Sequence, residues 1–364
     1  MKRILFVVGA RPNFMKVAPI IREMAKYPQD FEAILVHTGQ HYDIDMSKVF
    51  FDELELPNPD VNLEVGSGSH TWQTAQVMLR FEPVVLEYNP DWVIVVGDVN
   101  STLACALVCS KLRIRVAHVE AGLRSFDHTM PEEINRLLTD QIASLLFTPS
   151  PDANENLLRE GIPPKKIHFV GNIMIDTLVR LLPKANQRWP SLVERFGLNR
   201  YVLVTLHRPS NVDDPGTLAQ VMAALVEISK ETPVLVPVHP RTRQRIAESG
   251  LQSVARSLQL VEPLGYLDFL ALESHADVVL TDSGGVQEET TYLGIPCLTA
   301  RPNTERPITV TVGTNRLVES KQEALVPAVL AALDGGRKQG VVPELWDGMS
   351  AKRIVHTISQ FESF

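Results

Sequence analysis

The sequence predicts an α/β protein with two doubly wound parallel sheets. Short runs that are apolar throughout alternate with helix-like stretches along the whole chain, and strands buried on both faces are typical of parallel sheets covered by helices. The scheme occurs in each half of the chain, and 364 residues are enough for two domains of about 150 residues each. We therefore expect two separate α/β units and not one long sheet.

The first half contains apolar runs that are bounded by Gly, Asp, His or Pro. The strands predicted from them span residues 4–9, 33–39, 92–98, 115–120, 145–150 and 167–172. Helix-like stretches lie between them at Lys16–Tyr27, Thr71–Tyr88 and Ser101–Leu112. Strand, helix and next strand in this order form the unit from which a parallel sheet is built.

The second half repeats the same alternation. Its predicted strands span residues 201–207, 233–239, 258–264, 277–285, 296–300 and 316–320. The run at 277–285 ends in Ser and two Gly residues, so its last part is expected to be a turn at the start of a helix.

The boundary between the units is expected in the stretch Asn172–Leu198. No strand pattern appears there, and Pro183, Pro190 and Gly197 are expected to interrupt helices. The amphipathic stretch Ser350–Phe361 predicts a last helix that packs back on the first unit. The expected domains are residues 1–172 completed by 350–364, which carry the catalytic carboxylates, and residues 173–349, which bind the nucleotide.

Composition argues against several classes of function. With 35 Lys+Arg against 43 Asp+Glu the net charge is −8, which does not suggest a nucleic-acid-binding protein. Three cysteines without a CxxC motif argue against a disulfide framework and favour a reducing, cytoplasmic setting. The first apolar run is too short for a signal peptide, and no run reaches the ~18 residues of a membrane span. We therefore expect neither a nucleic-acid nor a membrane partner.

Polar and ionisable residues follow many of the predicted strands. Ligands of open α/β sheets bind beyond the carboxyl ends of the strands, so these residues predict one large site in a cleft between the two units. The residues at the strand ends are Arg11, His37, Asp98, Glu120, His207, His239 and Ser283–Gly285.

The segment DSGGVQEE (282–289) follows a buried strand and opens a helix. Gly284 and Gly285 allow close approach of a ligand to the backbone, Ser283 can donate to a phosphate, and the N–H groups of a helix start favour an anion. Glu288 and Glu289 lie one turn into this helix, where a carboxylate can accept from a pair of sugar hydroxyls or can act only on the helix dipole. The alternative is a capped turn in which Asp or Ser has only a structural role.

Basic residues suit a diphosphate better than a nicotinamide cofactor. Arg11 and Lys16 lie in GARPNFMK (9–16), which is neither a GxGxxG nor a Walker A motif, so no cofactor is expected. His207 ends another buried strand, and with Arg306 and the Gly-rich loop it predicts a second part of the anion site. A satisfied structural histidine is the alternative for His207.

Acidic residues are the candidates for proton transfer. Asp98 and Glu120 end apolar strands, where burial raises the pKa of a carboxyl group toward the range a general acid needs. The pair Glu132–Glu133 follows Pro131. The alternatives are that Asp98 caps a helix and that Glu132 and Glu133 lie at a helix start without a role in chemistry. No ligand spacing supports a metal site.

These motifs, as a set and in order, resemble the non-hydrolysing UDP-N-acetylglucosamine 2-epimerases. One motif would be unspecific, whereas the combination over residues 9–318 is highly specific. The matching segments are GARPNFMK, TGQHYD, VVGDVNST, HVEAGLRS, MPEEINR, FTPS, VGN, LHRPSN, PVHP, TDSGGVQEE and ERPITVTVGTNRLV.

The resemblance implies two Rossmann-like domains in a glycosyltransferase-B arrangement with the active site in the cleft between them. It implies reversible epimerisation at C2 of UDP-N-acetylglucosamine to UDP-N-acetylmannosamine. The route is anti elimination of UDP to 2-acetamidoglucal and re-addition of UDP, which needs no redox cofactor. It also implies a homodimer in the cytoplasm that binds a UDP-sugar substrate. The resemblance places the reaction in cell-surface polysaccharide biosynthesis.

Roles carry over onto the matching residues. The catalytic residues implied are the carboxylates Asp98, Glu120 and Glu132, with the face of C2 served by each left open, and His207. The substrate-binding residues implied are Arg11, His207, Ser283, Gly284 and Gly285 for the diphosphate, Glu289 for the ribose, and Lys16 and Arg306 for the charged part of the ligand.

Other interpretations of the same motifs stay open. They are a UDP-sugar glycosyltransferase, a hydrolysing epimerase, a 2-epimerase of a UDP-linked di-N-acetylated uronic acid, and a nucleotide-sugar-binding module without activity. Tyr42–Asp43 and residues 66–70 differ from the pattern of members activated by a second UDP-N-acetylglucosamine, so activation of this kind also stays open.

Overall fold

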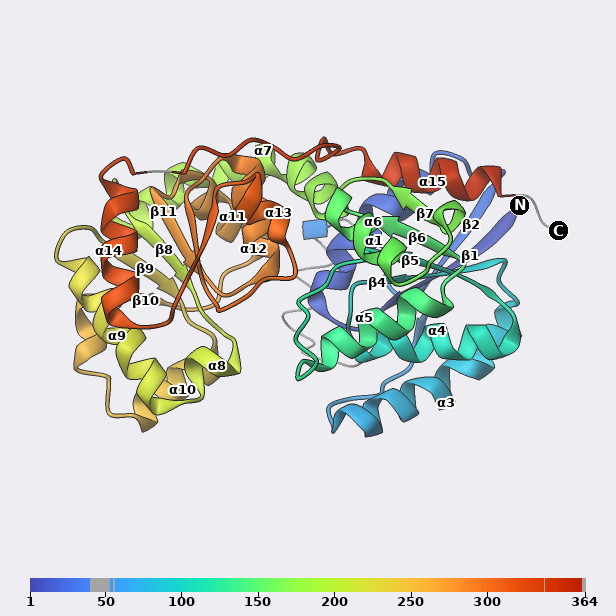
Figure 1. The fold of residues 1–364 in the computed structure, drawn as a ribbon, viewed down its shortest axis with the longest axis horizontal. Helices are drawn as coiled ribbons and strands as arrows, with labels where there is room; N and C mark the ends of the chain where they lie inside the picture. The colour runs from blue at the N-terminus through green and yellow to red at the C-terminus, as the bar shows by residue number, and fades with distance from the viewer. Residues whose placement is uncertain (40–52, 55, 337, 362–364) are drawn as a thin grey trace. The chain divides into compact units, whose positions relative to one another are not determined.

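Two parallel sheets organise the chain in the computed structural model, which describes residues 1–39, 53–54, 56–336 and 338–361. Unit 1 consists of Met1–Val179 with Glu344–Phe364, and unit 2 of Arg180–Pro343. Unit 1 contains a seven-stranded sheet and unit 2 a six-stranded sheet (Figure 1). The predicted α/β class with two doubly wound sheets is therefore confirmed. Residues Gln40–Asp43 of the TGQHYD segment lie outside the described ranges.

The sheet of unit 1 has the strand order β3-β2-β1-β4-β5-β6-β7. All neighbouring strands pair in parallel. Its strands are β1 (Lys2–Val8), β2 (Phe31–His37), β3 (Val61–Asn62), β4 (Trp92–Val96), β5 (Arg115–Val119), β6 (Leu145–Thr148) and β7 (Ile167–Phe169). Every strand predicted in this half is present, whereas the edge strand β3 was missed because two residues show no pattern.

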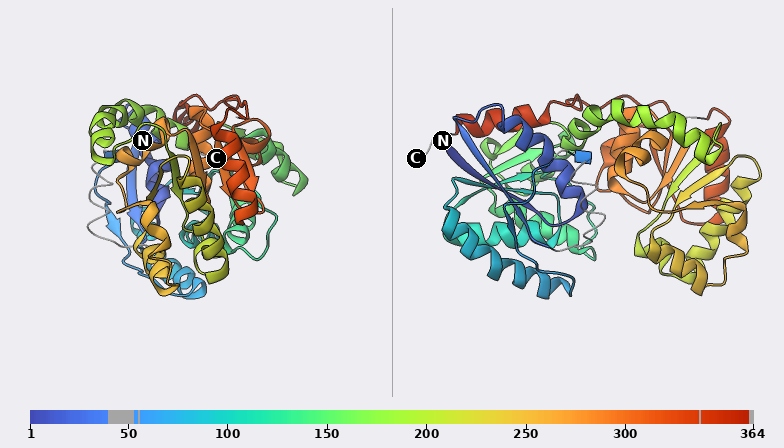
Figure 2. Two further views of the ribbon diagram at one scale, coloured as in Figure 1. Left: turned by 90° about the vertical axis from the view of Figure 1, so that its left-hand side faces the viewer. Right: turned by 180° about the vertical axis from the view of Figure 1, so that it is seen from behind.

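Helices cover both faces of this sheet. As a result, β4 and its neighbour β5 are buried on both sides. The helices of unit 1 are α1 (Arg11–Met24), α3 (His70–Tyr88), α4 (Asn100–Leu112), α5 (Pro131–Ile142), α6 (Pro151–Arg159), α15 (Ser350–Gln360) and the short η1 (Pro164–Lys166). α3 and α4 lie on one face, and α1 and α15 on the other (Figures 1 and 2). Cys105 and Cys109 on α4 are buried and unbonded to each other, as expected for core residues.

Unit 2 repeats the architecture with the strand order β10-β9-β8-β11-β12-β13. Its strands are β8 (Val202–Thr205), β9 (Val234–Pro237), β10 (Gln259–Val261), β11 (Val278–Thr281), β12 (Cys297–Ala300) and β13 (Asn315–Val318). Its helices are α8 (Pro209–Val212), α9 (Pro215–Ser229), α10 (Pro240–Glu248), η2 (Val254–Ser257), α11 (Tyr266–His275), α12 (Gly284–Leu293), α13 (Pro307–Thr311) and α14 (Gln322–Leu333). Apolar residues of α9 and α14 pack together on one face of its sheet.

The chain passes from unit 1 to unit 2 inside the helix α7 (Ile173–Phe196), at Val179–Arg180, and returns to unit 1 at Pro343–Glu344. The prediction that prolines interrupt helices in this stretch was wrong, since α7 contains both Pro183 and Pro190. Proline removes one backbone hydrogen bond and bends a helix, but packing of the remaining turns can keep it continuous. Among the described residues no helix, α7 included, is both long and apolar enough to cross a membrane.

The last helix, α15, belongs to unit 1 and is held there by buried polar contacts. The Asp176 carboxylate on α7 accepts from the backbone N–H groups of Ser350 and Ala351 at 3.0 and 2.8 Å. These N–H groups open α15 and have no partner within the helix, so Asp176 acts as a cap supplied from another element. At the other end, Lys2 Nζ donates to the carbonyl oxygen of Ile358 at 2.8 Å.

We predict that Asp176→Ala lowers the free energy of unfolding by about 2 kcal/mol, because it leaves two buried N–H groups unpaired. Urea unfolding of the whole protein measures the change. The matched control is Glu155→Ala, which removes only an exposed ion pair with Arg159 and is expected to cost less than about 0.5 kcal/mol. Equal effects of the two substitutions would contradict the capping role.

Candidate active site

Two neighbouring strands of unit 1, β4 and β5, end in turns that carry predicted carboxylates. Gly97, directly after β4, has a φ of +66°, and a Cβ atom there would lie 3.0 Å from Lys16 Nζ and 3.6 Å from Glu120 Oε2. Glycine is therefore required where the backbone approaches these charges. Glu120, directly after β5, has a φ of +71°, which costs about 1 kcal/mol or more for a residue with a side chain. Its N–H donates to the Phe147 carbonyl oxygen at 3.0 Å and helps to hold this turn.

Glu120 and Lys16 form a buried ion pair. Their side chains are only 4% and 8% exposed. Lys16 comes from α1, whose first residue is the exposed Arg11. A buried carboxylate without a partner costs several kcal/mol, so the ammonium group is the contact that makes this position possible for Glu120. The structure thus brings together Glu120, which the sequence predicted to be catalytic, and Lys16, which it predicted to bind the ligand.

Asp98 is paired with a cation that the sequence did not single out. Arg136, on α5, approaches one Asp98 carboxylate oxygen with Nη2 at 2.7 Å and Nε at 3.0 Å. The Asp98 side chain remains 30% exposed, so a ligand can reach it. The helix that follows begins at Asn100 and has Val99 as its cap residue. The alternative in which Asp98 caps this helix is therefore wrong.

The two glutamates at the start of α5 have different surroundings. Glu133 is buried and accepts from the backbone and hydroxyl of Ser125 at 3.0 Å, from the Phe126 N–H at 2.9 Å and from Arg136 at 2.5 Å. Glu132 is half-buried and has no hydrogen-bond partner within the described part of the chain. Glu133 is thus occupied by structural contacts, whereas Glu132 is available for chemistry.

A buried carboxylate, Asp282, organises the corresponding edge of unit 2. It accepts from the backbone N–H of His207 and of Arg208, at 3.0 and 2.9 Å, and from Asn211 Nδ2 at 2.9 Å. His207 Nδ1 lies 2.9 Å from the same carboxylate. Burial raises the pKa of Asp282, but the hydrogen bond and charge of His207, with the bonds from Asn211 and Arg208, outweigh burial and hold the pKa below its ordinary value. His207 therefore keeps its proton on Nδ1, and its half-exposed ring directs Nε2 away from Asp282.

The start of α12 brings a guanidinium group against the backbone. A Cβ atom on Gly284 would lie 2.5 Å from Arg306 Nη1 and 3.0 Å from Glu305 Oε1, so any other residue would displace these two side chains. Ser283 is the cap residue of α12, but its side chain makes no capping hydrogen bond. The plain capped turn is therefore not observed. The N–H groups of Gly284 and Gly285 open this helix, where an anion is favoured.

Three arginines and two glutamates form a buried cluster beside this helix start. Glu305 pairs with Arg301 at 2.6 Å and with Arg306 at 2.5 Å, and Arg208 lies 3.7 Å away. Arg306 also pairs with Glu288 at 2.7 Å. Burial, followed by repulsion from Arg301, lowers the pKa of Arg208. The three guanidinium groups of this cluster are donors that an anionic ligand can accept from.

Glu289 lies in a different environment from its neighbour Glu288. Its carboxyl group is buried, accepts from the Tyr266 hydroxyl at 2.6 Å and interacts with the buried Glu273 of α11. Burial raises the pKa of Glu289 to about 7, and burial together with the charge of Glu289 raises the pKa of Glu273 well above its usual range. Two interacting buried carboxyl groups favour a proton shared between them.

Sequence reasoning missed the partners of the predicted residues. Arg136 and Asp282 both lie inside motifs that the sequence singled out, MPEEINR and TDSGGVQEE, but an ionic partner far along the chain leaves no local signal. The pairing of Glu133 with Arg136 does leave a local signal, because the two residues are three apart, a spacing at which helical side chains meet.

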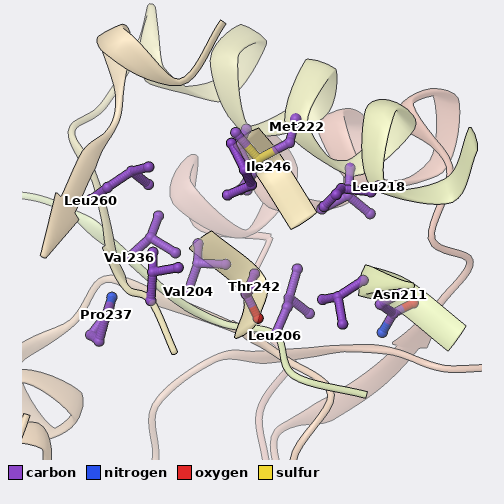
Figure 3. Close-up of a pocket in the computed structure, with 14 residues that line it drawn as sticks. Val204, Leu206, Asn211, Leu218, Met222, Val236, Pro237, Thr242, Ile246 and Leu260 are labelled. Carbon is purple, nitrogen blue, oxygen red and sulfur yellow. The ribbon is translucent and has the colours of Figure 1, made fainter. Parts of the chain in front are cut away.

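A pocket in unit 2 lies between β8, β9, α9 and α10 (Figure 3). Val204, Leu218, Met222 and Ile246 are among its apolar lining residues, and none of the lining residues is ionisable. Such a lining offers no group for acid–base chemistry, so the pocket is distinct from the charged edges described above. Among the described residues no cluster of His, Cys, Asp and Glu could hold a metal ion.

The two units together define a class of protein. One parallel sheet presents carboxylates paired with cations at its strand ends, and the other presents a cationic, glycine-rich helix start, as in two-domain α/β enzymes of nucleotide-linked substrates. The family model described as UDP-N-acetylglucosamine 2-epimerase matches residues 22–359. The chain belongs to this family, and the resemblance noted in its motifs is confirmed.

Several relatives extend over the whole chain. The UDP-N-acetylglucosamine 2-epimerase of Methanocaldococcus jannaschii is 45% identical over 98% of this chain and 99% of its own length. The UDP-2,3-diacetamido-2,3-dideoxy-D-glucuronate 2-epimerase of Pseudomonas aeruginosa is 42% identical over 98% and 99%. The crystal structure of the M. jannaschii enzyme with UDP-GlcNAc and UDP matches with a TM-score of 0.90 at 44% identity, over 99% of this chain and 100% of that chain. A glycosyltransferase of Rickettsia africae, at 15% identity and a TM-score of 0.54, shares the fold alone.

The different surroundings of Glu132 and Glu133 lead to opposite expectations. Glu133→Gln is expected to lower the free energy of unfolding by about 2–3 kcal/mol, because it removes a buried charge beside Arg136. Glu132→Gln is expected to change it by less than about 0.5 kcal/mol. Urea unfolding of both variants tests this, and a larger loss in Glu132→Gln would contradict the assignment.

The carboxyl pair of unit 2 predicts a dependence of stability on pH. An acid whose pKa is about 7 when folded, against about 4.3 unfolded, stabilises the fold fully below pH 4 and loses this contribution as the pH rises through 7. Glu289→Gln, which still accepts from Tyr266, is expected to flatten the fall in unfolding free energy between pH 5 and 8. The exposed Glu262→Gln is the control and should keep the wild-type slope. Identical slopes for all three proteins would contradict the shared-proton model.

Proposed function

We propose that the chain interconverts UDP-N-acetylglucosamine and UDP-N-acetylmannosamine by inverting C2 of the sugar. The observation that carries the proposal is the set of three carboxylates at the edge of unit 1, Asp98, Glu120 and Glu132. Two of them are held by their own cations, Lys16 and Arg136. Membership of the 2-epimerase family over nearly the whole chain supports the same substrate class.

The reaction proceeds by elimination and re-addition, because no carbonyl group lies next to C2 to make its proton acidic. A carboxylate removes the C2 proton, the electron pair of that bond forms the C1–C2 double bond, and the C1–O bond breaks with UDP as the leaving group. The intermediates are 2-acetamidoglucal and UDP. A carboxylic acid then protonates C2 on the opposite face while a diphosphate oxygen of UDP adds to C1. Atoms and electrons balance without a redox cofactor.

Unit 1 supplies the groups that move the proton. Asp98, Glu120 and Glu132 are the candidates for base and acid, and two roles on opposite faces of C2 need at least two of them. Lys16 and Arg136 fix the first two before substrate arrives, which removes reorganisation from the chemical step.

Unit 2 supplies the groups that hold UDP. Ser283, Gly284, Gly285 and Arg306 meet at the start of α12, and Arg11 of unit 1 adds a further positive charge for the diphosphate. Glu289 accepts from the ribose hydroxyls. Stabilisation of the departing diphosphate lowers the barrier to C1–O cleavage, because negative charge develops there in the transition state.

His207 both binds the diphosphate and transfers a proton to it. Asp282 holds its Nδ1 at 2.9 Å and so fixes the ring and its tautomer. When the ring carries a second proton, Nε2 donates it to the diphosphate as the C1–O bond breaks and accepts it back when UDP adds again. A carboxylate that orients a histidine in this way is a common arrangement for acid–base catalysis.

A second substrate is supported by one specific observation. The P. aeruginosa relative is 42% identical over nearly the full length of both chains and is named for a diacetamido glucuronate nucleotide. The elimination at C1 and C2 is the same for this sugar, and only the groups that meet C3 and C6 differ. We propose UDP-linked 2,3-diacetamido glucuronate as the alternative substrate.

We also propose that the enzyme is a cytoplasmic homodimer that pairs through α3. Cytoplasm is the setting in which the three free, buried cysteines remain reduced. The α3 helix exposes an apolar stripe that contains Trp72, Ala75, Leu79, Pro83 and Leu86, with Leu79 and Leu86 65% and 63% exposed. The spacing of three, four, four and three residues is symmetric about Leu79. An antiparallel second copy related by a two-fold axis therefore sets Trp72 against Leu86 and Leu79 against itself.

Proton NMR in D2O with UDP-N-acetylglucosamine tests the function directly. The expected products are UDP-N-acetylmannosamine and substrate, both with deuterium at C2 and with UDP retained. Free N-acetylmannosamine with UDP would point instead to the hydrolysing reaction. If only the diacetamido glucuronate nucleotide turns over, the alternative substrate replaces the first.

Substitution of the carboxylates separates catalysis from binding. Asp98→Asn and Glu120→Gln are expected to lower turnover by about 100-fold or more, since each loses a group that transfers a proton. Calorimetric titration with UDP should give a dissociation constant within about twofold of wild type, because neither carboxylate is among the residues proposed to bind the diphosphate. A loss of UDP affinity in either variant would move that residue to the binding set.

The oligomeric state is tested by light scattering after size exclusion. Leu79→Glu is expected to convert the dimer to a monomer, because a charge at the two-fold axis meets its own copy. Leu158→Glu, at a 48% exposed position on α6, is the control and should remain dimeric. A dimeric Leu79→Glu variant, or a monomeric wild type, would contradict pairing through α3.

A further inference from the structure

A buried histidine that has no part in the proposed reaction lies between the predicted catalytic turns. His118 is on β5, two residues before Glu120, and is fully buried. Its Nε2 lies 2.8 Å from the carbonyl oxygen of Gly97, the residue before Asp98. A carbonyl oxygen can only accept a hydrogen bond, so Nε2 carries a proton.

The other ring nitrogen faces a carboxylate. His118 Nδ1 lies 2.7 Å from Asp140 Oδ1, and Asp140 is fully buried on α5. Asp140 Oδ2 accepts from the Gly122 N–H at 3.1 Å and pairs with Arg124 at 2.8 Å. Burial raises the pKa of Asp140, but the charges and hydrogen bonds of His118 and Arg124 outweigh it and lower the pKa. An ionised carboxylate also only accepts, so Nδ1 carries a proton as well.

The charges around this histidine balance only if the ring is positive. Arg124 donates from Nε and Nη2 to Glu160 at 2.8 and 2.6 Å. The group then contains two cations, His118 and Arg124, and two anions, Asp140 and Glu160. Glu160 is 23% exposed and reaches solvent, whereas Asp140 is fully buried, so a positive His118 supplies a counter-charge to Asp140 where solvent cannot.

The hydrogen bonds of His118 connect all three elements that carry the catalytic carboxylates. Nε2 holds the turn after β4, which carries Asp98. The histidine is part of β5, which carries Glu120. Asp140 is on α5, whose first turn carries Glu132, eight residues earlier. A change in the length of either hydrogen bond therefore moves one carboxylate relative to the others.

We infer that His118 is a positioning residue, held as an imidazolium by Gly97 and Asp140, that sets the relative positions of Asp98, Glu120 and Glu132. It contacts no reacting atom. The inference rests on the proposed function for its catalytic consequence, whereas the protonation of the ring is a property of the folded protein alone.

Nitrogen NMR of the full-length protein, labelled with ¹⁵N-histidine, measures the protonation directly. The signals of His118 are identified by their loss in His118→Gln. Both ring nitrogens of His118 are expected to carry a proton, because each faces a hydrogen-bond acceptor. One unprotonated ring nitrogen would overturn the assignment as an imidazolium.

Steady-state kinetics of two variants measure the positioning. His118→Phe removes both donors and is expected to lower kcat by about 10- to 100-fold, since an error of about 1 Å in a catalytic group can cost about 100-fold. His118→Gln can still donate to the Gly97 carbonyl and is expected to retain more of kcat than His118→Phe. UDP affinity should stay within about twofold of wild type in both. Equal kcat in wild type and His118→Phe, or a parallel loss of UDP affinity, would overturn the inference.

A control histidine lies on β7, the edge strand of the same sheet. His168, on β7, packs against Phe147 with the two rings tilted by 48°, and no hydrogen bond among the described residues joins it to either catalytic turn. His168→Gln is expected to leave kcat and the His118 signals unchanged, and a fall in kcat as large as that of His118→Gln would contradict a specific role for His118. If His118→Phe does not fold, the Gln variant and the spectrum of the wild type still decide the question. Failure of the wild type to exchange C2 hydrogen would refute the proposed function and leave the protonation result intact.

Discussion

The pairing of buried charges at the strand ends is the constraint on which the rest of the structure depends. A carboxylate taken out of water costs several kcal/mol unless a cation or several donors replace the solvent. Glu120 therefore lies against Lys16, Asp98 against Arg136, and Asp282 against His207. Each of these partners comes from a different secondary-structure element. The charges thus fix how the turns, α1 and α5 sit around the sheet of unit 1, and how the loop after β8 sits beside β11 in unit 2.

The same pairing prepares the protein for chemistry. Groups that are oriented before substrate binds stabilise developing charge without reorganisation, and in many enzymes this stabilisation accounts for most of the rate enhancement. The turns show the cost of such orientation, because Glu120 holds a positive φ and Gly97 and Gly284 occupy places where a Cβ atom would meet a charged side chain. Glu132 differs from the other two carboxylates, since it is half-buried and its neighbour Glu133 makes the structural contacts.

Sequence predicted the parts of this protein that depend on local pattern. The wholly apolar runs placed the strands of both sheets, and the ordered motifs identified the family. It did not predict that α7 continues through Pro183 and Pro190, since packing decides whether a proline ends a helix. It also missed Arg136 as the partner of Asp98, because the two residues meet only through the fold. Within DSGGVQEE, the sequence assigned Asp282 no role beyond the alternative of a cap, and its contact with His207 became visible only through the neighbouring strand.

We propose that carboxylates of unit 1 act on C2 while unit 2 holds UDP during cleavage of the C1–O bond. Substrate with ¹⁸O in the bridge between C1 and the β-phosphate tests this most directly, with ³¹P NMR as the readout. We expect ¹⁸O to move from the bridging to the non-bridging positions of the β-phosphate as C2 inverts, because the bond breaks, the β-phosphate rotates and a different oxygen re-adds. Inversion of C2 with all ¹⁸O still in the bridge would contradict this elimination and re-addition.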